Sequence, residues 1–95
     1  MTNRGEFMSQ NDDKTMYDYA DKFINLANEM SKSDRSGNVG VAIRFAAARY
    51  SAFEASMRTD KLAEEKDKQL EFFANAFKEM LQMNIEDYIH LQSQK

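Results

Sequence analysis

Between residues 39 and 57 the apolar positions follow the period of an α-helix and surround most of its circumference. A helix that is apolar over most of its surface is normally buried. We therefore expect this segment, which ends near Arg58, to form the centre of the fold under two flanking helices. Its apolar residues form two adjacent stripes, the first of Val39, Ala42, Ile43, Ala46, Tyr50, Phe53 and Met57 and the second of Val41, Phe45 and Ala52.

Two further segments have a helical period. The first begins near Thr15, which has the side chain of an N-cap, and ends around residues 31–33. Residues 31–38, SKSDRSGN, are turn formers and predict the connection to the central helix, with Asn38 as its N-cap. The second segment runs from about Lys61 to Met83. Its main stripe is formed by Lys66, Leu70, Phe73, Phe77, Met80 and Leu81.

Two boundaries set the number of helices. Thr59-Asp60 offers a new N-cap, so we expect the central and third helices to be separate there. One continuous helix is the alternative, because neither glycine nor proline stands at this point. Asn84 and Asp87 have the spacing of a capping box and predict a restart. The predicted fold is all-α, an antiparallel three-helix bundle with a short C-terminal fourth helix.

We expect residues 15–92 to form a single helical domain. Residues 1–14 are polar and without period, which predicts a disordered tail, and residues 93–95 should fray. Residues 1–7, MTNRGEF, resemble a vector-derived leader, with Met8 as the natural start. Because the sequence shows neither a signal peptide nor an apolar run of membrane length, we expect a cytoplasmic protein without a membrane partner.

The composition limits the kinds of site and partner that we expect for this chain. The 95-residue chain contains no cysteine, which excludes disulfides, thiolate zinc sites and a cysteine nucleophile. Its net charge is −3, whereas phosphate contacts need a basic face, so we expect no nucleic-acid partner. A chain of this length buries a modest core, which makes oligomerisation a reasonable source of stability.

His90 is the single histidine, and Glu86 lies one helical turn before it. Such a pair could hold a divalent metal. Helical di-iron sites, however, need a second histidine and further inward carboxylates, which this chain cannot supply. A surface histidine favoured by the dipole at a helix C-terminus is the preferred interpretation. We therefore expect no metal, no cofactor and no enzymatic activity.

Arg49 lies between the two apolar stripes of the central helix, on the side that we expect to be covered. A buried guanidinium needs acceptors for its donors, so two arrangements are open. Either its head reaches solvent along a packed stem, or it pairs with a carboxylate. The candidate carboxylates are Asp18, Asp21 and Asp87.

Phe72, Ala76 and Met83 form a second stripe on the third helix, roughly 60–100° from the main one. One helix of a three-helix bundle seldom needs so wide an apolar arc. Either the short final helix covers this stripe, or the stripe is a surface for a protein partner or a second copy, together with Tyr17 or Tyr88.

Three parts of the chain are distinctive in their order and spacing. They are residues 19–28 (YADKFINLAN), residues 46–53 (AAARYSAF), and Met80-Leu81 with residues 84–89 (NIEDYI). Together they resemble a family of short, uncharacterised bacterial all-helical proteins, classed as a domain of unknown function. The resemblance covers roughly residues 16–91. It implies a compact helical fold and a bacterial, cytoplasmic protein, and it brings no activity, ligand or catalytic residue.

Two functions from different classes remain. We expect a small non-enzymatic protein-interaction module that associates with itself, as a homodimer, through Phe72, Ala76 and Met83. The alternative is a binder of a small apolar or anionic ligand in a pocket between helices, with Arg49 as the ligand contact.

Overall fold

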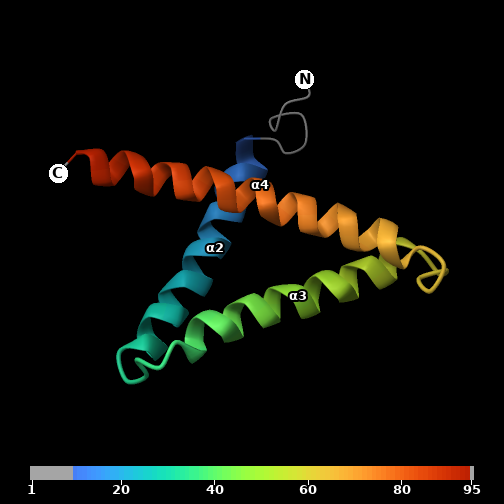
Figure 1. The fold of residues 1–95 in the computed structure, drawn as a ribbon, viewed down its shortest axis with the longest axis horizontal. Coiled ribbons are helices and arrows are strands. Elements are labelled where there is room, and N and C mark those ends of the chain that lie inside the picture. The colour runs from blue at the N-terminus through green and yellow to red at the C-terminus, as the bar shows by residue number, and fades with distance from the viewer. Residues whose placement is uncertain (1–9, 95) are drawn as a thin grey trace. The chain divides into compact units, whose positions relative to one another are not determined.

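The computed structural model describes residues 10–94, and these residues form three helices and no strand (Figure 1). The helices are α2 (Gln10–Ser31), α3 (Asn38–Arg58) and α4 (Lys66–Ser93). The predicted all-helical class is therefore confirmed. Residues 1–9, which include the expected vector-derived leader and most of the expected tail, lie outside the described residues, as does residue 95.

The chain divides into two compact units, residues 1–47 and residues 48–95, and the division falls inside α3. The first unit contains α2, its connection to α3 and the N-terminal half of α3. The second contains the C-terminal half of α3, a second connection and α4. Each unit is therefore one corner, made of two helical segments and the connection between them.

Helix α2 begins at Gln10 rather than at Thr15, so it includes the last residues of the segment expected to be a tail. Lys14 and Asp18 form an ion pair of 3.1 Å one turn apart, and Lys32 pairs with Glu29 at 3.2 Å beside the other end. Such exposed pairs stabilise a helix by about 0.2–0.5 kcal/mol each. Ion pairs between such near neighbours stabilise α2 independently of tertiary packing.

The connection between α2 and α3 is an Asx turn (a turn closed by an aspartate side chain). Asp34 Oδ1 accepts hydrogen bonds from the Ser36 backbone N–H at 2.9 Å and from the Ser36 hydroxyl at 2.5 Å. The Ser36 hydroxyl oxygen in turn accepts the N–H of Asn38 at 3.1 Å. Gly37 follows with φ +97°, a left-handed conformation that favours glycine, and its carbonyl accepts the N–H of Val41. Gly37 thus occupies the N-cap position that the sequence assigned to Asn38.

This turn predicts a local dependence on pH. The Ser36 hydroxyl bond, followed by the Ser36 backbone bond, lowers the pKa of Asp34 below its ordinary value of 3.8. A lowered pKa means that the ionised carboxylate stabilises the turn above pH 3.8, and that this contribution is lost as the pH falls through the lowered pKa. Asp34→Ala should therefore speed amide hydrogen exchange at Ser36 and Asn38 at neutral pH. Asp34→Asn, which keeps an acceptor oxygen, should retain protection and remove the acid-induced change. Equal exchange in the Asp34→Ala chain and the parent would contradict this prediction.

The central helix is not buried in the single chain. Ala46 is exposed, Tyr50 keeps 63% of its surface accessible and Phe53 keeps 54%. Among the described residues the only buried apolar side chain is Ala55. The prediction that the chain's own flanking helices would cover this segment is therefore not supported. The apolar pattern shows that a face favours burial, but it does not show which chain supplies the cover.

Helix α4 is continuous from Lys66 to Ser93, so the predicted short fourth helix is wrong. Asn84 does not cap a new helix, because its side-chain N–H donates to the carbonyl of Met80 at 2.7 Å, one turn back in the same helix. The antiparallel bundle is not supported either. Such a bundle buries the apolar stripes of all its helices, whereas the described residues bury only Ala55 and Gln69.

Candidate functional site

The connection between α3 and α4 is built from local hydrogen bonds. Thr59 Oγ1 accepts the N–H of Lys61 at 3.0 Å, and the Lys61 carbonyl accepts the N–H groups of Glu64 and Glu65 at 3.0 Å each. The Glu65 carbonyl accepts the N–H of Gln69 and so closes the first turn of α4. The expected break after Arg58 is present, but α4 begins at Lys66 rather than at Lys61.

Arg58, the last residue of α3, joins the two helices of this corner. Its Nε donates to the side-chain oxygen of Gln69 at 2.9 Å. Its guanidinium carbon lies 3.9 Å from the centroid of the Phe72 ring and 5.8 Å from that of Phe73. The two rings are 5.0 Å apart and almost perpendicular. This arrangement combines a charge-assisted hydrogen bond with stacking of a cation on an aromatic face.

Burial distinguishes this cluster from the other side chains described in the second unit. Gln69 is only 6% exposed, and on the other side of the connection Ala55 is 6% exposed. A buried amide needs a hydrogen-bond partner, and Arg58 supplies it. The C-terminus of α3 also favours a cation through the helix dipole. Because the guanidinium already contacts Gln69 and Phe72, the cluster holds the two helices of this corner together. We call Arg58, Gln69, Phe72 and Phe73 the Arg58 clamp.

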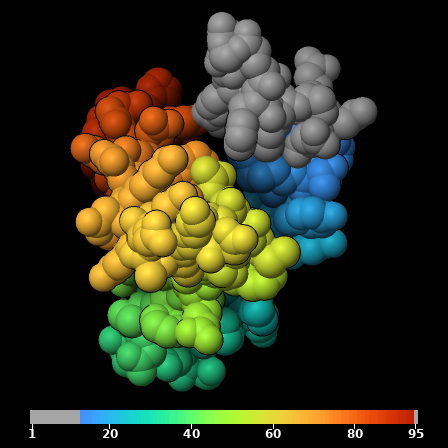
Figure 2. Space-filling view, turned by 90° about the vertical axis from the view of Figure 1, so that its right-hand side faces the viewer, coloured from blue at the N-terminus to red at the C-terminus, as the bar shows by residue number. Residues whose placement is uncertain are grey.

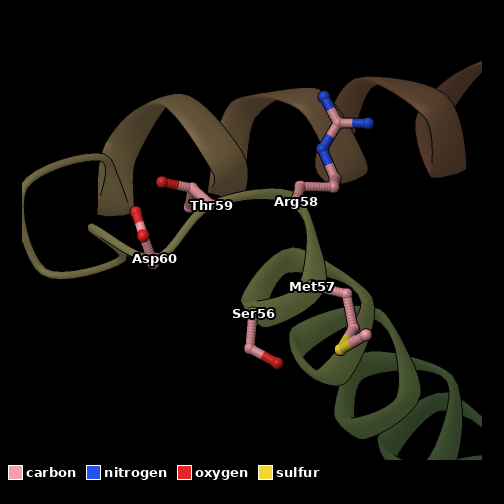
Figure 3. Close-up of a pocket in the computed structure, with 5 residues that line it drawn as sticks. All are labelled: Ser56, Met57, Arg58, Thr59 and Asp60. Atoms are coloured by element: carbon pink, nitrogen blue, oxygen red, sulfur yellow. The ribbon is translucent and has the colours of Figure 1, made fainter.

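A depression of about 560 Å³ lies beside this clamp. Five consecutive residues line it: Ser56, Met57, Arg58, Thr59 and Asp60. Their side chains diverge, with Arg58 directed toward α4 and Ser56 and Met57 directed away from it (Figure 3). The connection and the adjoining ends of α3 and α4 form one continuous surface (Figure 2). Binding sites for small molecules need convergent polar groups in a concave wall, and the depression does not provide them.

Phe72, Ala76 and Met83, the predicted partner surface, all lie on α4 and are all exposed. Phe72 keeps 46% of its surface accessible although one face of its ring is covered by Arg58. Met83 keeps 41%. Phe72 therefore already packs against Arg58 within the chain. Binding of a partner by this stripe stays a prediction.

Arg49 is exposed on α3, so a covered position for its side chain is not supported. One of its proposed partners, Asp18, is paired with Lys14 instead. The role of Arg49 as a ligand contact stays a prediction. His90 and Glu86 are both exposed on α4, and within residues 10–94 no group of three or more potential metal ligands comes together.

Sequence reasoning treated Arg58 only as the end of the central helix and so missed the clamp. The available signal was its position at the end of an apolar helix, followed by a break and then by the adjacent aromatic pair Phe72-Phe73. A cation at a helix end opposite two rings is a plausible stacking partner, but only the path of residues 59–65 brings them together.

None of the helices in the described part of the chain has both the length and the apolarity needed to cross a bilayer. No curated protein and no solved structure matches the chain. One family model does match, described as "Protein of unknown function (DUF3144)", and it covers residues 16–89. The match spans α3 and most of α2 and α4, including the Arg58 clamp. The chain therefore belongs to the DUF3144 family of proteins of unknown function.

Proposed function

We propose that the chain is a non-enzymatic protein-interaction module that associates with itself. One observation carries the proposal: the described helices expose large apolar side chains along their whole lengths. Twenty-one such side chains in the helices keep between 41% and 74% of their surface accessible, from Tyr17 in α2 to Leu91 in α4. Monomeric proteins rarely expose apolar patches of more than a few hundred Å².

The energetics favour association. Covering the accessible half of one such side chain contributes about 1 kcal/mol. Ten of them covered on each chain would contribute on the order of 20 kcal/mol per dimer, which exceeds the roughly 4–15 kcal/mol that association costs. Other copies of the chain are present in any solution of the protein, so self-association is the simplest way to cover these side chains.

The non-enzymatic part of the proposal rests on the sequence. A single histidine and the absence of cysteine leave few groups for acid–base or nucleophilic chemistry. The negative net charge argues against nucleic acid as a partner. We place the protein in a bacterial cytoplasm, in line with the resemblance of its segments to bacterial proteins and with its cysteine-free composition.

Sedimentation velocity from low to high micromolar concentrations tests the proposal. We expect a mass above 11.0 kDa that rises to a plateau at twice this value or a higher multiple. A monomeric mass at high micromolar concentration would overturn self-association. A thermal-shift screen against metabolites gives the corresponding test of the ligand alternative, because a specific ligand raises the melting temperature.

A further inference from the structure

One face of α4 has the residue spacing of a helix that pairs with another helix. Starting at Leu70, apolar residues recur at alternating spacings of four and three over three heptads. They are Leu70, Ala74, Phe77, Leu81, Tyr88 and Leu91, and we call them the α4 stripe. Asn84 occupies the one polar position in the series. The stripe lies within a single continuous helix and spans about 32 Å.

The α4 stripe is exposed along its whole length. Leu70 keeps 63% of its surface accessible, Phe77 47%, Leu81 46%, Tyr88 66% and Leu91 56%, and Ala74 is exposed as well. The clamp residues Gln69 and Phe72 are offset from this stripe around the helix, so the corner with α3 leaves it uncovered. The side-chain N–H of Asn84 donates to the carbonyl of Met80, so part of this polar side chain is already hydrogen-bonded within the single chain.

From these observations we infer that two copies of the chain pair through the α4 stripe, with their α4 helices antiparallel. The inference rests on the proposed self-association and names its orientation. It assigns the association to the α4 stripe in place of Phe72, Ala76 and Met83, the surface expected from the sequence. When Leu70 of one copy lies level with Leu91 of the other, Phe77 lies level with Asn84 and Leu81 with Met80. The interface is then isologous (the same patch on both copies), as closed two-fold dimers require.

Charge selects the antiparallel orientation. The first half of α4, residues 66–78, carries three lysines and two acids, for a net charge of +1. The second half, residues 79–93, carries three acids and no lysine or arginine, for a net charge of −3 with His90 neutral. Antiparallel pairing places each positive half against a negative half and opposes the two helix dipoles. Parallel pairing places the two −3 halves together.

The area is that of a specific but modest interface. A half-exposed large side chain offers about 100 Å². The five large residues of the stripe, with Met80 at its edge and 52% exposed, therefore offer about 600 Å² per chain. The resulting total of about 1,200 Å² lies at the lower end of the range for stable protein–protein interfaces. We therefore expect a dimer that forms in the micromolar range.

Single cysteines test the orientation, because the chain has none of its own. In an antiparallel pair only positions near the two-fold axis meet their own copies, so Leu81→Cys alone should cross-link with a short bifunctional maleimide. Leu91→Cys alone should not cross-link. A mixture of Leu70→Cys and Leu91→Cys chains, unfolded and refolded together, should give a mixed cross-linked dimer. Efficient cross-linking of Leu91→Cys with itself would overturn the antiparallel arrangement.

A matched pair of substitutions tests the surface. Leu91 and Ile89 are of similar size and exposure, at 56% and 59%, and point about 200° apart on the same helix. Leu91→Lys should raise the dimer Kd about tenfold or more, because it places a charge in the interface. Ile89→Lys should leave the Kd within about twofold, and circular dichroism checks that both stay helical. Equal effects, or association without stripe cross-links, would overturn this interface alone, whereas a monomeric parent would overturn the proposed self-association too.

Discussion

The free energy of unfolding should fall by about 2 kcal/mol when Arg58 is replaced by alanine. A hydrogen bond to a charged group contributes roughly 1.5–3 kcal/mol and an exposed cation–π contact about 0.5–1 kcal/mol. Arg58→Ala removes both and leaves the oxygen of Gln69, a 6% exposed residue, without its protein partner. Urea unfolding at one fixed protein concentration measures the change.

Three comparisons make this prediction specific. Arg49→Ala removes an exposed arginine from the same helix and should change the free energy of unfolding by less than about 0.5 kcal/mol. Arg58→Lys keeps the charge but loses the Nε donor and the planar stack, so it should fall between Arg58→Ala and the parent. A double-mutant cycle with Gln69→Ala should give a coupling energy of at least about 0.5 kcal/mol. Additive single effects would contradict the clamp.

The melting temperature should rise by about 5–10 °C over a hundredfold increase in protein concentration. If folding is coupled to dimer formation, mass action stabilises the folded chain by about 1.4 kcal/mol over this interval. For a domain of this size each kcal/mol corresponds to about 4–8 °C. Differential scanning calorimetry at several concentrations between low and high micromolar measures the slope.

The variants of the α4 stripe supply the control for this measurement. Leu91→Lys should flatten the dependence of the melting temperature on concentration, whereas Ile89→Lys should retain it. A parent chain whose melting temperature is independent of concentration would show that its exposed apolar side chains stay uncovered by a second copy.

Local signals in the sequence located most of the secondary structure. The helical periods around Phe23, Tyr50 and Phe77 predicted α2, α3 and α4, and the turn formers of residues 31–38 predicted the connection that Asp34 and Gly37 build. The break after Arg58 was expected as well. These features depend on propensities and on hydrogen bonds between residues a few positions apart, so they can be inferred from short windows.

Helix ends were less accurate where two local solutions compete. Asn84 has the side chain of an N-cap, but within α4 the same side chain bonds to the Met80 carbonyl and the helix continues through it. Thr59 was expected to start the third helix, but its hydroxyl oxygen accepts the N–H of Lys61 in the connection. In both cases the same polar side chain is able to act as an N-cap or to form another local hydrogen bond. The sequence alone does not show which of the two is more stable.

The sequence by itself determined that this chain is helical and that its helices carry wide apolar faces, because both properties follow from the period of neighbouring residues. Only the tertiary structure decided that Arg58 is clamped between Gln69 and Phe72 and that Tyr50, Phe53 and the α4 stripe are exposed in the single chain. The physical reason is that burial depends on which surfaces meet across a connection. An apolar period records the preference of a face for cover and carries no information on whether that cover comes from the same chain or from another.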